Sequence, residues 1–558
     1  MDVVLVGLPG SGKSVVGRRL AARHRAAFID LDDVIERTAG SSIPEIFAAD
    51  GEDGFRERER SAVAALGGPD RRPEIARVIA TGGGTVVDPR NRWRLYRGRL
   101  AIWLDGRPEV LAQRLRRSVT IRPLVAGRDP VGAVRTLAAD RRRFYAAANR
   151  VAGVAELRTV VENVDRLVAE QRELPLPASS QAAVRLLQAE TSIGSIVLGA
   201  GIAGGAILAA LDELGARRAI LVSEPGAWEA AGQAIAAELA QAGRQVEQVL
   251  LPRGEAAKRL SVIDEAASQL ARLRVERSEP IVAIGGGALG DAAGFLAATF
   301  LRGIPVVHVP TTLVGQIDSA IGGKTAVDLP EGKNLVGAFH QPATIVIDIT
   351  FLRTLPVRER RAALAEAVKM ATLGDERLFA LLETDGEAIA QGMAAVFESG
   401  AVAELVERAG WAKVEIVSHD EREAGDRIRL NLGHSLGHAF EAAAGYAGLL
   451  HGEAVGYGLR AACRIGLELG VTPGERAMRV ERLLDTLALG VRPLDLPLER
   501  VMAMLATDKK HAGGQLRWVL PTADGTIVRP GVPDELVERI SAQLLEPSAA
   551  SAVGGVRS

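Results

Sequence analysis

A glycine-rich run directly after a short apolar segment places the strongest constraint on how this chain can fold. Residues 3–6 read Val-Val-Leu-Val, and residues 7–14 read Gly-Leu-Pro-Gly-Ser-Gly-Lys-Ser. A buried strand that turns through glycines into a helix leaves backbone N–H groups free to converge on phosphate oxygens. A lysine and a serine at the end of such a loop can reach the terminal phosphates and a magnesium ion. The sequence therefore predicts an α/β domain with a nucleotide site formed by Gly10, Gly12, Lys13 and Ser14.

Length and composition describe a multidomain protein that acts on small molecules. A chain of 558 residues is too long for one core and predicts three or four folding units. With 47% hydrophobic residues and a net charge of −1, the chain has no basic field that would attract nucleic acid or a membrane surface. Cys463 is the only cysteine, which excludes an intrachain disulfide. Because the first apolar stretch is also too short for a secretory signal, we expect a cytoplasmic location.

Changes in composition along the chain divide it into regions. A stretch rich in proline and serine, at residues 173–180, indicates a linker. After it, short apolar runs alternate with helical stretches, which predicts a mostly parallel sheet with crossover helices. After about residue 350 the strand-like runs stop, and the spacing predicts a helical domain. The expected strands are at 196–198, 219–222, 248–251, 280–284, 305–309 and 344–347. The expected regions are a nucleotide domain at 1–170, a linker at 171–188, an α/β domain at 189–348, a helical domain at 349–545 and a disordered tail at 546–558.

The first region contains further candidates for a site. Residues 28–32, Phe-Ile-Asp-Leu-Asp, read as a strand that ends in two carboxylates. Alternate positions of a strand share a face, so Asp30 and Asp32 are expected to project together, one toward the water shell of a metal and the other toward a hydroxyl. Arginines suit the binding of a planar carboxylate and of phosphoryl charge. The remaining candidates are Arg56, the glycine triplet at 82–84, Arg122 and the arginines at 141–143.

This set resembles the shikimate kinase family over residues 1–165. The resemblance implies that Asp30 helps to organise magnesium, while Asp32 binds shikimate hydroxyls and acts as the base. It also implies that Arg122 belongs to a lid that closes over ATP. The shikimate-binding residues implied by the resemblance are Arg56, Gly82, Gly83 and Arg141.

Two positions depart from that pattern and leave alternatives open. Three successive arginines at 141–143 leave open which one faces the carboxylate, and either Arg114 or Arg116 can stack on adenine. A gluconate or nucleoside kinase would share the phosphate loop, but it would not need this set of arginines for an acid.

The second region has its densest signal between residues 284 and 341. Residues 285–291, Gly-Gly-Gly-Ala-Leu-Gly-Asp, follow an expected strand and precede a helical stretch, which suits close approach of the backbone to a pyrophosphate. Polar and cationic residues separated by glycines follow, and they predict an anionic substrate across loops at a cofactor pocket. These residues include Thr311, Thr312, Asp318, Lys324, Lys333 and Asn334.

Histidines gather in the helical region. His434 and His438 share one helical face with Asn431 on the same side, and carboxylates are available on other elements. Two histidines and one carboxylate form a plausible zinc set that leaves a coordination position for substrate. From spacing alone, the ligands would be His434 and His438.

The pattern is similar to the 3-dehydroquinate synthase family over residues 190–530, and this resemblance changes the ligand set. It implies that the metal is bound by Glu366, His434 and His451, whereas His438 handles substrate and protons. Arg302 resembles an arginine that reaches the phosphate from a neighbouring subunit, which implies a homodimer. The implied substrate-pocket residues are Asp318, Lys324, Asn334, Lys369, Lys413, Arg427, Asn431 and Lys510, with Lys509 as the alternative to Lys510. The implied NAD-binding residues are Glu255, Lys258, Gly286, Gly287, Asp291, Thr311, Thr312, Lys324 and Lys333, and Glu224 stands where the family usually has Asp or Asn.

Together, the two resemblances imply a bifunctional enzyme of the shikimate pathway. One half would phosphorylate shikimate with ATP and Mg²⁺. The other would convert 3-deoxy-D-arabino-heptulosonate 7-phosphate to 3-dehydroquinate and phosphate with NAD and Zn²⁺ or Co²⁺. One alternative makes the C-terminal half another sugar-phosphate cyclase or a metal-dependent polyol dehydrogenase. Another makes one half an inactive nucleotide- or NAD-binding regulator.

Overall fold

The computed structural model describes most of the chain, in several segments. These are residues 1–70, 72–116, 129–153, 156–173, 183–423, 425–446, 448–511 and 516–546, with the backbone alone at 172–173 and 508–511. Arg122 lies outside the described residues, as do the side chains of Lys509 and Lys510. The chain forms two compact units. One comprises Met1–Glu190, Ser195–Ala206 and Val346–Ile349, and the other comprises Thr191–Gly194, Ile207–Ile345 and Thr350–Ser558.

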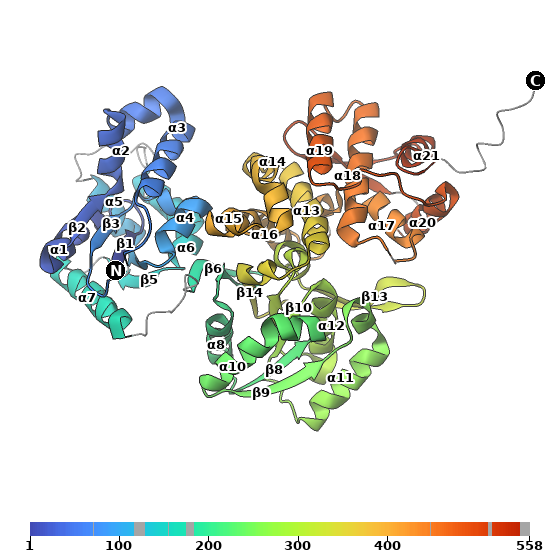
Figure 1. Ribbon diagram of the computed structural model, residues 1–558, viewed down its shortest axis with the longest axis horizontal. Helices are drawn as coiled ribbons and strands as arrows, with labels where there is room; N and C mark the ends of the chain where they lie inside the picture. Colours follow the sequence, from blue (N-terminus) through green and yellow to red (C-terminus); the bar gives the residue numbers. More distant parts are fainter. Residues whose placement is uncertain are drawn as a thin grey trace, which may run out of the picture. The chain divides into compact units, whose positions relative to one another are not determined.

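The N-terminal domain is a five-stranded parallel sheet in the order β2-β3-β1-β4-β5 (Figure 1). Its central strand β1 is fully buried because apolar residues fill every position between Val3 and Val6. Buried side chains of α1 and α7 pack against this sheet. The strands are β1 (Asp2–Val6), β2 (Ala27–Asp30), β3 (Arg77–Ala80), β4 (Leu100–Asp105) and β5 (Asn149–Ala152). The helices are α1 (Lys13–His24), α2 (Leu31–Ala39), α3 (Ile43–Ala65), α4 (Pro89–Tyr96), α5 (Pro108–Arg116), α6 (Pro130–Tyr145) and α7 (Leu157–Glu173).

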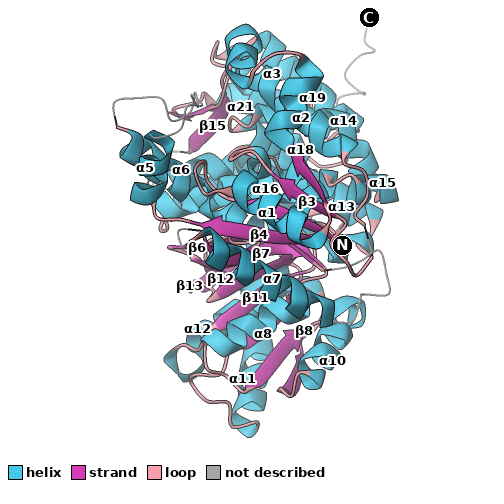
Figure 2. Ribbon diagram, turned by 90° about the vertical axis from the view of Figure 1, so that its left-hand side faces the viewer, coloured by secondary structure: helices cyan, strands magenta, loops and turns pink. Residues whose placement is uncertain are grey.

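A seven-stranded sheet in the order β6-β7-β14-β11-β10-β8-β9 follows. The run from β14 to β9 is parallel, and helices cover its strands (Figure 2). Each expected strand between residues 196 and 347 is present, so the predicted α/β fold is confirmed. The strands are β6 (Val184–Thr191), β7 (Gly194–Ala200), β8 (Arg218–Ser223), β9 (Gln245–Leu250), β10 (Ile281–Gly285), β11 (Val306–Pro310) and β14 (Thr344–Asp348). The helices include α8 (Ala203–Glu213), α10 (Gln233–Gln241), α11 (Leu260–Arg272) and α12 (Gly287–Thr299).

Two features of this region were not expected. Strand β6 begins at Val184, inside the stretch expected to be a linker. A hairpin of β12 (Lys324–Leu329) and β13 (Gly332–Phe339) carries Lys324, Lys333 and Asn334 of the glycine-punctuated run. Both features mix polar with apolar residues, so they do not form the continuous apolar runs from which strands were predicted.

The C-terminal region is mainly helical, but not entirely. After residue 350, β15 (Arg517–Pro521) and β16 (Thr526–Pro530) pair as an antiparallel hairpin. Trp518, Val519 and Leu520 are buried, so the hairpin is stabilised by packing rather than by a larger sheet. The helices are α13 (Val357–Thr372), α14 (Glu376–Gln391), α15 (Ala394–Glu398), α16 (Ala401–His419), α17 (His434–Ala443), α18 (His451–Glu468), α19 (Gly474–Thr486), α20 (Leu498–His511) and α21 (Asp534–Ala542). Within the described residues, no helix has both the length and the apolar character needed to cross a bilayer.

Candidate active sites

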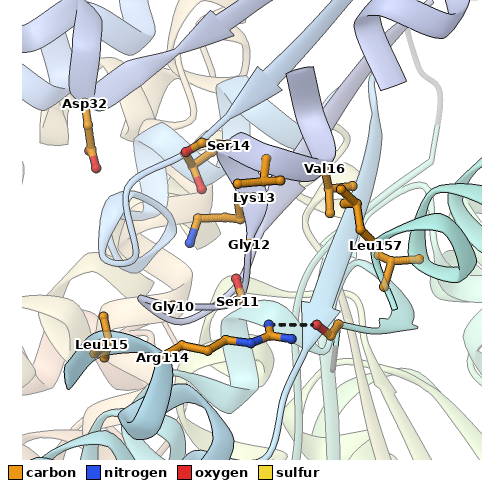
Figure 3. Close-up of a pocket in the computed structure, with 14 residues that line it drawn as sticks. Gly10, Ser11, Gly12, Lys13, Ser14, Val16, Asp32, Arg114, Leu115 and Leu157 are labelled. Carbon is orange, nitrogen blue, oxygen red and sulfur yellow. Dashed lines mark hydrogen bonds between the residues drawn. The ribbon is translucent and has the colours of Figure 1, made fainter. Parts of the chain in front are cut away.

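The glycine-rich loop between β1 and α1 has the geometry expected of a phosphate cradle. Gly7, Gly10 and Gly12 have φ values of 143°, 82° and 90°, which side chains rarely adopt. The Nζ atom of Lys13 donates to the carbonyls of Gly7 at 2.8 Å and Leu8 at 3.1 Å. A pocket of about 380 Å³ opens over this loop (Figure 3). Its lining includes Ser11, Ser14, Asp32, Thr81, Arg114 and Leu157.

The two carboxylates after β2 do not share a strand, and this corrects the sequence interpretation. β2 ends at Asp30, and α2 begins at Leu31, so Asp32 lies in the first turn of a helix. Asp30 is the N-cap of that helix, and its side chain accepts a hydrogen bond from the backbone N–H of Asp32 at 3.2 Å. The preference of Asp for this capping position explains why the chain leaves the strand there. Asp32 nevertheless lines the pocket, and a Cβ added at Gly82 would lie 2.8 Å from its Oδ1.

Arg56 is held by two carboxylates on its own helix, α3. Its guanidinium lies 2.9 Å from the exposed Glu52 and 2.9 Å from the buried Glu59. Thr85 donates to the other oxygen of Glu59 at 2.7 Å. Burial alone would lower the pKa of Arg56, but Glu59 and Glu52 together outweigh this and raise it. Sequence analysis missed Glu59, although its spacing of three residues from Arg56 on a helix was a usable signal.

The arginine candidates of α6 separate into different environments. Arg141 is buried and donates to the carbonyl of Gly83 at 2.8 Å, and the Tyr145 hydroxyl donates to the same carbonyl. Arg142 instead lies over the Trp103 ring and Arg143 over the Phe144 ring. The geometry thus favours Arg141 as the arginine beside the glycine triplet.

Of the two candidates for stacking on adenine, Arg114 lines the loop pocket. Arg114 donates to the carbonyl of Gly153 at 3.2 Å (Figure 3). Arg116 is not among the residues that line this pocket. The geometry therefore favours Arg114.

In the second unit, the Gly-Gly-Gly run lies where strand β10 passes into helix α12. Gly286 is the N-cap of this helix, so the first-turn N–H groups of α12 are available to a phosphate. A Cβ at Gly286 would lie 3.1 Å from Thr312, and one at Gly287 would lie 2.9 Å from Ser319. Side chains at these two positions would leave less space for a phosphate to approach the N-terminus of α12. The Thr311 N–H donates to the Gly285 carbonyl at 2.9 Å. This contact places Thr311 and Thr312 beside the carboxyl end of β10, at the same edge of the sheet as the glycine run.

A cluster of predicted residues lies next to that edge. Lys258 donates to Asp291 at 2.7 Å and also to the Asn334 side chain. Burial raises the pKa of Asp291 even with Lys258 beside it. Glu224 accepts a hydrogen bond from the Gly254 N–H at 2.9 Å, so its carboxylate is held in the neighbouring loop.

The candidate metal ligands come from three helices that pack closely. α13 carries Glu366, α17 begins at His434, and α18 begins at His451. A Cβ at Gly452 would lie 2.0 Å from the carbonyl oxygen of Ala362, so only glycine allows α18 to approach α13 this closely. The close packing brings the three ligands together.

The spacing of these three groups fits one metal ion. Glu366 Oε1 lies 3.4 Å from Nε2 of His434 and 3.4 Å from Nε2 of His451. Two ligands at about 2.1 Å from a tetrahedral ion are about 3.4 Å apart. Both oxygens of Glu366 are buried and accept no well-aligned hydrogen bond from the described residues, although Lys369 Nζ lies 2.5 Å from Oε2. Burial opposes ionisation of Glu366, but Lys369 and then His434 outweigh it and hold the pKa well below its usual range.

His438 joins the cluster without replacing Glu366. Ligand atoms of His434, His438 and His451 lie within 4.8 Å of one another. The three imidazoles therefore form a second candidate set, while Glu366 Oε1, at 3.4 Å from both His434 and His451, meets the tetrahedral spacing. Burial, followed by His434 and His451, lowers the pKa of His438 to about 3, so its imidazole is neutral at neutral pH. The distances to Glu366 support Glu366 with His434 and His451, and the pair obtained from spacing alone, His434 with His438, stays a prediction.

Buried lysines and one aspartate lie beside the metal candidates. Asp318 sits in a π-helical turn, η6 (Gly315–Ser319), and its Oδ1 lies 2.7 Å from Lys413 Nζ and 3.8 Å from Lys369 Nζ. Burial lowers the pKa of Lys413 despite Asp318, whereas Glu366 raises the pKa of Lys369 against the effect of burial. The site therefore holds two cations next to two carboxylates away from bulk water.

The outer part of this site contains a carboxylate that the sequence did not indicate. Glu423 pairs with Lys324 and accepts from the Asn431 side chain at 3.2 Å. Its backbone has a φ of 61°, in the left-handed region. Arg427 is buried and donates to the Gly322 carbonyl at 3.3 Å. No metal or nucleotide motif includes Glu423, so only the fold reveals it.

Arg302, in contrast, lies apart from these contacts and is exposed. Leu301 and Arg302 have consecutive φ values of 49° and 66°. Two left-handed residues in succession cost conformational energy, and both residues are exposed.

Comparison with known proteins identifies the second region. The 3-dehydroquinate synthase N-terminal model matches residues 248–362, and the C-terminal model matches residues 363–511. The synthase of Symbiobacterium thermophilum is 44% identical over 319 residues, which cover 56% of this chain and 86% of that protein. The chain belongs to the 3-dehydroquinate synthase family. The synthase of Halorhodospira halophila is 41% identical over 351 residues and is covered to 96%.

The first region matches the shikimate kinase family model over residues 9–171. The predicted fusion of a shikimate kinase with a 3-dehydroquinate synthase is thus confirmed, and the chain carries both enzyme activities.

A solved structure is similar to the synthase region. It is that of ValA, a 2-epi-5-epi-valiolone synthase from Streptomyces hygroscopicus with NAD⁺ and Zn²⁺ bound. It is 30% identical with a TM-score of 0.57, and the match covers 63% of this chain and 96% of ValA. A 2-deoxy-scyllo-inosose synthase at 24% identity, also with a TM-score of 0.57, shares the fold.

Proposed function

We propose that each activity has its own site, served by the residues grouped above. At the first site, ATP with Mg²⁺ phosphorylates shikimate. At the second site, NAD and Zn²⁺ or Co²⁺ assist the conversion of 3-deoxy-D-arabino-heptulosonate 7-phosphate to 3-dehydroquinate and phosphate. The observation that carries the second assignment is the 3.4 Å spacing of Glu366 Oε1 from the imidazoles of His434 and His451.

In the kinase site, Lys13 and Ser14 bind the terminal phosphates and Mg²⁺. Asp32 receives the proton of the attacking hydroxyl, which its place in the pocket lining supports. Arg56, kept in place by Glu59, pairs with the carboxylate of shikimate, and Arg141 is at hand beside Gly83. A lid role for Arg122 remains a prediction, because this residue lies outside the described part of the chain.

In the synthase site, a bound zinc ion would polarise the vicinal hydroxyls of the substrate, and NAD would accept and return a hydride. Lys369 and Lys413 hold the anionic groups of the substrate, and Asp318 keeps both ammonium groups in position. His438 is neutral and buried, so it can accept a proton close to the metal ligands. The outer contacts to substrate come from Lys324, Asn334, Arg427 and Asn431.

Two alternatives concern the substrate of the synthase half. The similarity to ValA, which acts as a 2-epi-5-epi-valiolone synthase, keeps another sugar-phosphate cyclase as the second candidate. Identities of 44% and 41% to two 3-dehydroquinate synthases, against 30% to ValA, favour the heptulosonate phosphate. Phosphate release without accumulation of NADH would support the cyclase chemistry, whereas steady formation of NADH from simple polyols would favour a dehydrogenase.

We further propose a homodimer in which Arg302 of each chain serves the site of its partner. The exposure of Arg302 on a backbone of left-handed conformation supports this role. A cytoplasmic location is proposed from the single, buried cysteine. Mixing two inactive variants, Arg302→Ala and His434→Ala, should restore synthase activity, because some mixed dimers would contain one complete site. Absence of any recovery would contradict the shared site.

The two assignments are tested with one purified chain and two assays. Lys13→Ala should abolish shikimate phosphorylation and spare the synthase, and His434→Ala should do the reverse. Alanine in place of Arg19, an exposed residue of α1 that does not line the pocket, is a control that should leave both reactions intact. If either active-site substitution removed both activities from a folded protein, the two-site assignment would be wrong.

A further inference from the structure

The two imidazole ligands are oriented by different acceptors. His434 Nδ1 lies 3.1 Å from the carbonyl oxygen of Leu432, a neutral acceptor. His451 Nδ1 lies 3.0 Å from Oε2 of Glu441, a carboxylate. In both cases the hydrogen bond at Nδ1 leaves Nε2 to face Glu366. Only the His451 contact has a charged acceptor. A charge-assisted hydrogen bond is stronger than a neutral one, so it fixes the orientation of the imidazole more firmly.

Glu441 uses its second oxygen for a different partner. Its Oε1 lies 2.9 Å from Nζ of Lys333 on β13, and Lys333 also lies 3.2 Å from Glu255 and 4.5 Å from the centre of the Tyr446 ring. Glu441 itself is largely buried, with 9% of its side chain exposed. One carboxylate therefore joins a metal ligand of the helical region to the hairpin of the α/β region.

The hairpin also reaches the proposed NAD-binding edge. Asn334 follows Lys333 directly, and its side chain accepts from Lys258, which in turn pairs with Asp291 on α12. Asn334 holds a left-handed φ of 60°. Lys333 contacts Glu441 and Asn334 contacts Lys258, as expected for adjacent strand residues, whose side chains point to opposite faces. A ligand that fixes this hairpin would therefore also fix Lys333 against Glu441.

We propose that Glu441 is a positioning residue with two functions: it holds His451 in the orientation needed for the metal, and through Lys333 it couples metal binding to NAD binding. This inference rests on the proposed function, since it requires a metal between Glu366, His434 and His451. A carboxylate on the far nitrogen raises the basicity of an imidazole ligand, and loss of such a partner typically weakens metal affinity by about 10- to 100-fold. If NAD raises the affinity for the metal through this contact, thermodynamic linkage requires that the metal raise the affinity for NAD by the same factor.

The chain offers a close control for this proposal. Glu453 lies two residues after His451 on α18 and forms an ion pair with Arg358 at 2.7 Å. Glu453→Gln removes one carboxylate and one ion pair near the same helix start, but the described contacts do not join it to an imidazole. A purely structural role for Glu441 would make Glu441→Gln and Glu453→Gln behave alike.

The test measures zinc affinity of the metal-free full chain by competition with a fluorescent chelator. Wild type should bind one zinc ion per synthase site, and His434→Ala should abolish this binding. Glu441→Gln should weaken it by about 10-fold or more, Glu441→Ala should weaken it further, and Glu453→Gln should stay within about twofold of wild type. With Co²⁺ in place of zinc, the visible absorption spectrum should change in Glu441→Gln but not in Glu453→Gln.

The coupling is measured by repeating the titrations with saturating NAD⁺. NAD⁺ should raise the zinc affinity of wild type by about fivefold or more, and this factor should approach one in both Glu441→Gln and Lys333→Gln. Equal zinc affinity in Glu441→Gln and Glu453→Gln would overturn the positioning role, and a wild-type factor of one would overturn the coupling. If wild type itself bound no zinc that depends on His434, the proposed function would fail instead. If Glu441→Ala does not fold, the two glutamine variants decide the question alone.

Discussion

Lys13 of the kinase site donates to carbonyls five and six residues away, whereas Lys413 of the synthase site reaches Asp318, 95 residues distant in sequence. The two lysines also differ in one partner. Lys13 donates to backbone carbonyls at the floor of a pocket, while Lys413 donates to the backbone carbonyl of Asp318 and also pairs with its half-buried carboxylate at 2.7 Å. A local loop can thus lose its lysine and keep its shape. The synthase site depends on charges that balance one another across the fold.

The largest effect should come from removing the synthase metal alone. A zinc-selective chelator, with Mg²⁺ kept in excess, should reduce synthase turnover to background and leave shikimate phosphorylation unchanged, because only the second site includes a Glu366, His434 and His451 set. Both reactions are assayed on the same sample, and zinc is then added back. Loss of kinase activity in parallel would break the comparison between the two sites.

The next effect concerns folding rather than turnover. Lys369→Met should destabilise the metal-free synthase half by about 3–5 kcal/mol, because it leaves the buried carboxylate of Glu366 without its nearest cation. Zinc should restore much of the loss by supplying that charge. Denaturant unfolding with and without zinc measures the difference, and Lys13→Ala is the control that should leave the unfolding of its own domain almost unchanged. An equal cost in both states of metal loading would contradict charge balance as the cause.

The pH dependence of stability should also distinguish the two halves. Burial, followed by His340, lowers the pKa of His308 on β11 from 6.5 to about 4. Between about pH 6.5 and pH 4, His308 binds a proton in the unfolded chain but not in the folded chain. The free energy of unfolding therefore falls as the pH decreases through this range, by up to about 3 kcal/mol. His308→Gln should reduce this slope in the synthase transition without removing it, because the pKa of His438 is also lowered by burial. His24→Gln, in the kinase domain, should leave that transition as it is.

The smallest effect tests Arg56. Glu59→Gln should raise the KM for shikimate about tenfold with little change in kcat, because the buried partner that orients the guanidinium loses its charge. Glu52→Gln removes an exposed partner of the same arginine and should change KM by less than about twofold. Steady-state kinetics with both variants gives the KM for shikimate of each variant relative to wild type. Equal effects would mean that Glu59 does not position Arg56.

Much of the fold was predictable because it depends on local patterns. The apolar run at residues 3–6 and the glycines that follow it specify strand, loop and helix in one segment. The buried parallel strands of the second sheet were equally clear as continuous apolar runs. The hairpin of β15 and β16 was missed because it is stabilised by packing on neighbouring elements, which no local pattern records.

The candidate sites were predictable only in part. Period-two alternation at Asp30 and Asp32 gave the wrong local structure, since a helix cap competes with strand continuation at that point. Spacing on one helix suggested His434 with His438, and the approach of α13 and α18 was needed to bring Glu366 and His451 together. Glu441 did carry a signal, seven residues after His434 on the same helical face, but that signal becomes specific only when His451 is beside it.

The backbone contacts of Lys13 have a consequence for how tightly the kinase domain can hold a nucleotide. A lysine side chain carries up to about 2 kcal/mol of rotamer entropy, and here that freedom is already lost to the Gly7 and Leu8 carbonyls. A phosphate that binds therefore replaces the contacts of Lys13 with these carbonyls, and it does not have to order a mobile lysine side chain. Part of the affinity for nucleotide is thus fixed when the loop folds.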